Sequence, residues 1–174
     1  VVKDAESVNA VLSGIFVDKV ICQYVGTIGF WKNNIGKLLK YLKGKPQILE
    51  EDMLSYISAA SARCSDVFGD TDTLEEAYEI LSIPDSSEML DKAKAQLYAL
   101  LLNVASGRIA ETNNVQFTLY LSLNEKYPTI PQEDYPLTAG EAIDLSCNNI
   151  YTGTDLEFAK DICDVINNGF LTKA

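Results

Sequence analysis

The sequence predicts a mainly α-helical single domain, a compact bundle of about six helices with a minor β element. Three observations carry this prediction. Thr or Asp is followed three residues later by Glu four times along the chain, as at capped helix starts. Apolar residues repeat at helical spacing over most of the sequence. The 174 residues, 47% of them hydrophobic, suffice for one sizeable core and are few for two, so we expect residues 1–174 to be one domain.

The helices follow from these signals in order along the chain. Apolar spacing predicts a helix over residues 35–43, ended by Gly44 and Pro46. Before it, residues 15–22 fit a helix or a strand equally well. The further predicted helices cover residues 50–63, 87–106, 139–151 and 155–168. The four capping signals pair Thr73 with Glu76, Asp85 with Glu88, Thr138 with Glu141 and Thr154 with Glu157.

Residues 115–123 break the helical pattern, because apolar and more polar side chains alternate without interruption. Their composition also favours a strand. A single strand is not stable alone, so it must pair with residues 15–22 or with a strand of a neighbouring chain. In the second case its apolar residues belong to an assembly edge. These are Val115, Phe117, Leu119 and Leu121.

The charge is strongly negative and unevenly distributed. The net charge is −11, yet residues 32–45 hold five lysines and no acid, whereas residues 46–174 hold 22 Asp and Glu against 7 Lys and Arg. The overall acidity argues against nucleic acid as a partner, and no apolar run approaches the roughly 18 residues of a membrane span. Lys37, Lys40 and Lys43 form either a solvated helix face or a basic face that docks on another copy or on an anionic cell-wall polysaccharide.

The four cysteines, Cys22, Cys64, Cys147 and Cys163, contain no Cys-x-x-Cys pair, and the chain has no histidine, which argues against a zinc site. They form either two disulfides in an oxidising compartment or buried free thiols in a cytosolic protein. Among three possible connectivities we predict 147–163 with 22–64, because residues 147 and 163 fall on an expected antiparallel helix pair.

The absence of histidine also excludes Ser-His-Asp and Cys-His catalysis and the metalloprotease helix. A lysozyme-like hydrolase could still use two carboxylates, and Glu50, Glu51 and Asp52 are the candidates. Three consecutive acids point in different directions, however, and are typical of a helix start. We therefore expect no enzyme activity.

A second acidic cluster surrounds Gly69. Asp66, Asp70 and Asp72 supply oxygen ligands of the kind that calcium prefers. The alternative is a capped helix start, because acids there complement the helix dipole. The EF-hand order of ligands is not met, so we expect no cofactor.

The only tryptophan lies in Gly-Thr-Ile-Gly-Phe-Trp-Lys-Asn-Asn, residues 26–34. We predict a corner before the lysine-rich helix, formed by Gly29, Phe30, Trp31, Lys32 and Asn33. One interpretation is an aromatic plug that seats this helix on the core. The other is a surface that stacks on carbohydrate or docks a partner.

Four segments resemble a module found in large secreted and surface proteins of archaea and bacteria. They are the Gly-Phe-Trp-Lys-Asn element, Leu-Asn-Val-Ala-Ser-Gly at 102–107, Thr-Ala-Gly-Glu-Ala at 138–142 and Ala-Lys-Asp-Ile-Cys-Asp-Val-Ile-Asn-Asn-Gly at 159–169. In that group His-Pro often follows the aromatic element, whereas Asn34 and Ile35 stand near that position here. The resemblance implies no established activity; it implies an extracellular, non-catalytic domain of the cell envelope.

These observations predict a cell-surface structural protein that assembles with copies of itself into a filament or lattice. The first alternative is a glycan- or partner-binding adhesion module of a larger surface protein, which requires an exposed Trp31. The second alternative is the carboxylate-dependent glycan hydrolase.

Overall fold

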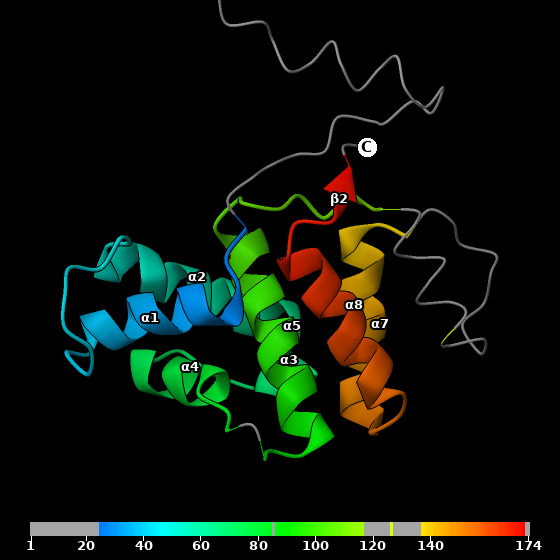
Figure 1. Ribbon diagram of the computed structural model, residues 1–174, viewed down its shortest axis with the longest axis horizontal. Helices are drawn as coiled ribbons and strands as arrows, with labels where there is room; N and C mark the ends of the chain where they lie inside the picture. Colours follow the sequence, from blue (N-terminus) through cyan, green and yellow to red (C-terminus); the bar gives the residue numbers. More distant parts are fainter. Residues whose placement is uncertain (1–24, 85, 117–125, 127–136, 173–174) are drawn as a thin grey trace, which may run out of the picture.

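The computed structural model describes residues 25–84, 86–116, 126 and 137–172, and in these ranges the chain is mainly α-helical, as predicted (Figure 1). No helix in them is both long and apolar enough to cross a membrane. The helices are α1 (Ile28–Leu38), α2 (Glu50–Arg63), α3 (Ser65–Phe68), α4 (Leu74–Leu81), α5 (Met89–Ala105), α7 (Ala139–Thr152) and α8 (Leu156–Asn167). Two short strands, β1 (Asn114–Val115) and β2 (Leu171–Thr172), pair antiparallel.

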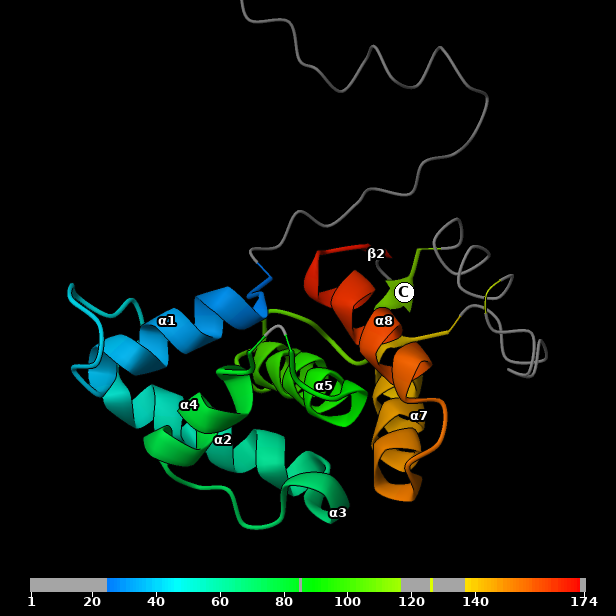
Figure 2. The same cartoon turned by 60° about the horizontal axis from the view of Figure 1, so that its bottom comes forward.

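Helix α5 lies at the centre of the molecule. Figures 1 and 2 show α7 and α8 on one side of it and α1, α2 and α4 on the other, and α5 contacts all five of these helices. Its residues 97–103 are all buried, although one of them is an asparagine. A helix that is apolar on every side is typical of a position between two layers.

Two of the four predicted capping signals are confirmed. The Thr73 and Thr138 side chains each accept from the backbone three residues on, and Glu76 and Glu141 return the bond as capping boxes. Thr154 is not a cap, because α8 begins after Asp155, whose φ is 42°. Helix α5 begins after Glu88, which makes no side-chain capping bond.

The first helix begins seven residues earlier than predicted, at Ile28 instead of residue 35. Thr27 is its N-cap, with a side-chain oxygen that accepts from the Phe30 N–H at 3.3 Å. The segment expected to form a corner before the helix is therefore its first two turns. The sequence signal for this start, a threonine without a glutamate three residues later, is weaker than the capping box.

The predicted helix over 35–43 is also wrong at its end, because α1 stops at Leu38. Lys40 adopts a left-handed conformation with φ of 61°, which reverses the chain. The Leu42 N–H then donates to the Gly36 carbonyl at 3.0 Å. A Cβ on Gly36 would lie 2.9 Å from a Leu42 methyl carbon, so Leu42 packs on the helix that its spacing predicted it to extend.

The predicted β partner is wrong at Val115. This residue pairs with Leu171 of the same chain, and its N–H donates to the Leu137 carbonyl at 2.8 Å. It is 2% exposed, so it is not available as part of an assembly edge. Phe117, Leu119 and Leu121, with the rest of residues 117–123, and the proposed partner strand 15–22 lie outside the described residues.

Candidate functional site

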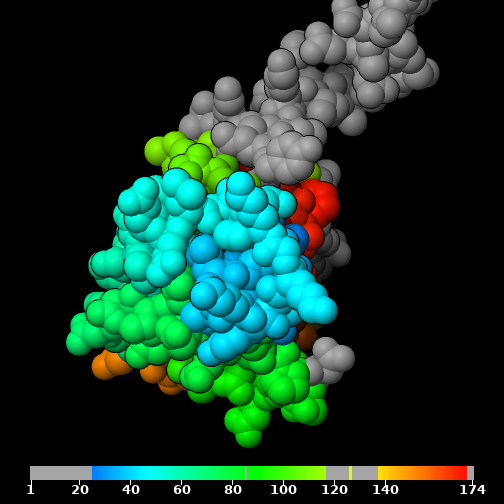
Figure 3. Space-filling view, turned by 90° about the vertical axis from the view of Figure 1, so that its left-hand side faces the viewer, coloured from blue at the N-terminus to red at the C-terminus, as the bar shows by residue number. Residues whose placement is uncertain are grey.

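The lysine-rich segment forms one end of the molecule. We call residues 39–49, which connect α1 to α2, the basic loop. Lys40, Lys43 and Lys45 are exposed on it, and Lys37 is half-buried in the last turn of α1. None of them forms an ion pair with a residue that the structure describes. Figure 3 looks onto this end, where the atoms of the loop (cyan) lie over α1 (blue).

Large apolar side chains lie among these lysines. Tyr41 is 60% exposed and Leu49 is 64% exposed. The Tyr41 ring packs edge-on against Tyr78 of α4, with 5.3 Å between the ring centroids. The basic loop thus combines positive charge with apolar area, and such mixed surfaces are suited to docking.

Asn34 holds the far end of the basic loop against α1. It is 3% exposed, and its Oδ1 accepts from the Gln47 N–H at 2.7 Å while its Nδ2 donates to the Phe30 carbonyl at 2.9 Å. Leu42 holds the near end through its bond to Gly36. Because the loop is attached at both ends, its lysines have a defined position relative to the helices.

Trp31 is fully buried, which agrees with the structural interpretation of the aromatic element. Its ring lies 6.5 Å from that of Tyr56, centroid to centroid, and the Arg108 guanidinium lies 5.4 Å from it. A Cβ on Gly26 would lie 2.5 Å from its Nε1, so the chain before α1 runs directly over the indole. In this position the ring is not exposed for stacking on a sugar, as the glycan-binding alternative requires.

A buried amide network, which sequence reasoning missed, fixes the same segment. The Gly26 N–H donates to Asn103 Oδ1 at 2.7 Å, and Asn103 Nδ2 donates to the Gly26 carbonyl at 2.8 Å and to Asn167 Oδ1 at 3.0 Å. Asn167 Nδ2 then donates to the Gln96 carbonyl at 2.9 Å. The available signal was an asparagine within each of two apolar helical runs.

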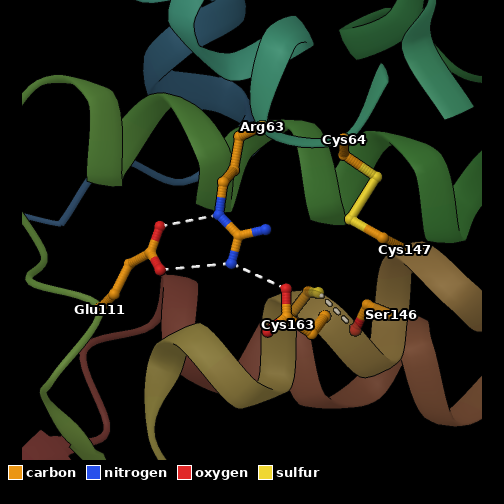
Figure 4. Close-up of a disulfide and its surroundings, with 7 residues drawn as sticks. Arg63, Cys64, Glu111, Ser146, Cys147 and Cys163 are labelled. Carbon is orange, nitrogen blue, oxygen red and sulfur yellow. Dashed lines mark hydrogen bonds and ion pairs between the residues drawn. A yellow bond between two sulfur atoms is a disulfide. The ribbon is translucent and has the colours of Figure 1, made fainter. Parts of the chain in front are cut away.

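The predicted cysteine pairing is wrong. The disulfide joins Cys64 to Cys147, with Cα atoms 6.0 Å apart (Figure 4). Cys163 is free and fully buried, and its Sγ lies 3.4 Å from Ser146 Oγ as a hydrogen-bond donor. Cys147 follows Ser146 on α7 and so faces a different direction, toward the end of α2. Cys22 lies outside the described residues.

Next to this disulfide, Arg63 at the end of α2 links that helix to α7 and to the segment that contains Glu111 (Figure 4). Its guanidinium binds both Glu111 oxygens, at 2.9 and 3.2 Å, and Asp144 Oδ1 at 2.8 Å. The pKa of Arg63 is raised above its usual value, chiefly by the bonds to Glu111 and to a smaller extent by the bond to Asp144. The bidentate pair has a fixed geometry that holds the segment around Glu111 against the end of α2, and the single bond to Asp144 connects α7 to the same guanidinium.

Burial raises the pKa of the Cys163 thiol from 9.0 to about 12. The native state therefore holds this proton more tightly than the unfolded chain does. Its contribution to stability is complete below about pH 9 and is lost as the pH rises toward 12, with a slope of about 1.4 kcal/mol per pH unit. In this pH window we expect Cys163→Ala to reduce the slope of the unfolding free energy against pH by about 1.4 kcal/mol per pH unit, which corresponds to one bound proton. Equal slopes in urea titrations of the two proteins would contradict this account.

The carboxylate candidates lie on helix starts and turns. Glu50, Glu51 and Asp52 form the first turn of α2 and are exposed. Asp66, Asp70 and Asp72 are exposed around the turn that leads into α4. Among the described residues, no three Asp, Glu, Cys or His side chains converge as metal ligands would. The Asp72 N–H instead donates to Glu76 of the α4 capping box, at 3.3 Å.

A groove of about 350 Å³ lies along α7, beside the Arg63 cluster. Glu141 and Asp144 give it negative charge and two leucines give it apolar area. The Asp144 side chain is 65% exposed although it binds Arg63. Among the described residues its lining is Leu137, Glu141, Asp144, Leu145 and Asn148.

The basic loop and the α7 groove are thus two surface features with opposite charge and with apolar area of their own. Their chemistry is suited to binding. Comparison with protein-family models, curated proteins and solved structures finds no match for the chain.

Proposed function

We propose that this chain is a non-catalytic structural protein of the extracellular surface that assembles with copies of itself, and that the basic loop supplies one side of the subunit contact. The observation that carries the proposal is the concentration, at one end of an acidic molecule, of exposed apolar side chains and of lysines that form no ion pair with any described residue.

The charge distribution supports a second copy as the partner. Outside the lysine segment the chain holds 22 acids against 7 basic residues over positions 46–174. A lysine-rich end therefore meets complementary potential on most of the surface of another copy. Such complementarity steers association and fixes orientation.

The exposed apolar side chains of the basic loop contribute binding free energy that charge alone does not supply. Surface ion pairs contribute little net free energy, whereas fully burying an exposed side chain such as Leu contributes about 1.5–3 kcal/mol. Tyr41 and Leu49 are both more than half exposed. Because the basic loop is attached at Gly36 and Asn34, docking also requires little additional ordering.

The disulfide supports the extracellular location. Disulfides persist in oxidising compartments and are rare in the cytosol. The Cys64–Cys147 bond joins residues 83 positions apart, on α7 and at the junction of α2 and α3, so it connects the two sides of the bundle.

Reversing two loop charges tests the proposal. We expect Lys40→Glu/Lys43→Glu to abolish polymers in sedimentation velocity at low salt without changing the circular dichroism melting curve. Both side chains are exposed, so the fold does not depend on them. The matched control is Lys92→Glu/Lys94→Glu on α5, which changes the net charge equally and should leave assembly intact. Polymers of unchanged size in the loop variant, or their equal loss in the control, would refute a role for the basic loop.

A further inference from the structure

We infer that the α7 groove is the receiving site for the basic loop of a second copy, so that subunits join head to tail. This inference rests on the proposed function and names the second surface of its contact.

The groove matches a lysine in both charge and shape. Glu111, Glu141 and Asp144 lie in or beside it, and among the described residues one cation, Arg63, pairs with Glu111 and Asp144. The site therefore keeps a net negative charge. A lysine has a long apolar stem and a terminal ammonium, which can lie on Leu137 and Leu145 and against the carboxylates, respectively.

The loop presents this chemistry in a short stretch. Lys40 and Lys43 flank two apolar residues, Tyr41 and Leu42, and all four are exposed. Both surfaces therefore combine charged and apolar side chains within a few residues of one another. Electrostatic complementarity of this kind selects the partner and its register.

The two surfaces cannot meet within one molecule. The basic loop ends at the start of α2, whereas Arg63, the last residue of α2, holds the groove through Asp144. Fourteen helical residues separate them, which is about 21 Å at 1.5 Å per residue. Figure 1 likewise shows the loop after α1 at one end of the molecule and α7 at the other.

A contact between different surfaces at opposite ends does not close on itself in a pair. Each added copy leaves one free loop and one free groove, so the assembly extends into a filament, or into a ring if the rotation closes. A two-fold symmetric contact would instead stop at a dimer.

Complementary variants test this arrangement. The loop variant is Lys40→Glu/Lys43→Glu, and the groove variant is Asp144→Asn/Asn148→Lys, which leaves Arg63 its bidentate bond to Glu111. We expect each variant alone to be monomeric. Their equimolar mixture should form 1:1 dimers that do not extend, because only one intact loop and one intact groove remain per pair. Mass photometry and sedimentation velocity measure this, with Asp91→Lys on α5 as a control of equal charge change that should still polymerise.

The outcomes separate the two proposals. A groove variant that polymerises like wild type, while the loop variant is monomeric, overturns the groove and leaves self-assembly standing. Two folded monomeric variants that give no dimer when mixed overturn head-to-tail docking, as does a control that fails to polymerise. A wild-type chain that is monomeric under all conditions overturns the proposed function itself.

Discussion

Replacing Cys64 and Cys147 together with serine is expected to lower the free energy of unfolding by about 4 kcal/mol. The bond closes a loop with a sequence separation of 83 residues, and its loss restores that conformational freedom to the unfolded chain. Domains of ordinary stability have only about 5–15 kcal/mol in total. The double variant should therefore unfold at a much lower urea concentration than wild type.

Reductant provides the control for this prediction. Wild type treated with a thiol reductant should move to the midpoint of the double variant, and the double variant should not respond. An unchanged wild-type midpoint after complete reduction, shown by mass spectrometry of alkylated thiols, would mean that the bond does not stabilise the fold. A response of the double variant would show that another cysteine pair contributes.

Replacing Trp31 with alanine is expected to cost about 3–5 kcal/mol, because the residue is the largest fully buried side chain and its removal leaves a cavity. The loss should extend to the chain before α1, since Gly26 lies directly on the indole. Urea unfolding followed by circular dichroism measures the change.

The neighbouring Phe30 is the matched control. It is only half-buried and lies under Arg108, with 4.5 Å between the guanidinium and the ring centroid. Phe30→Ala should cost less than half as much as Trp31→Ala. Equal costs would contradict the assignment of Trp31 as the buried anchor of this segment.

In wild type, the single tryptophan should also show blue-shifted emission that added polysaccharide leaves unchanged.

Much of the fold could be predicted from local signals. Helix α2 occupies the predicted residues 50–63, and the capping boxes at Thr73 and Thr138 give two further starts. The predicted end of the first helix was wrong because apolar spacing does not distinguish a continuous helix from a chain that turns back. Leu42 packs on the apolar face of α1 after a left-handed residue at Lys40.

The errors at the cysteines and the strand have a different origin. Pairing depends on which way each helix faces, and Cys147 faces α2 while Cys163 faces Ser146. Val115 found its partner in residue 171, almost at the other end of the chain, and no local pattern reports such a contact. The lysine segment was visible from charge alone, whereas the α7 groove required the packed structure.

Sedimentation velocity of the purified chain across a concentration series at low and high salt, with negative-stain electron microscopy of the same samples, tests the central claim most directly. Self-assembly through the basic loop predicts large species and ordered filaments or sheets at low salt, which dissociate at high salt as charge is screened. A monomer at every concentration and salt level would contradict it.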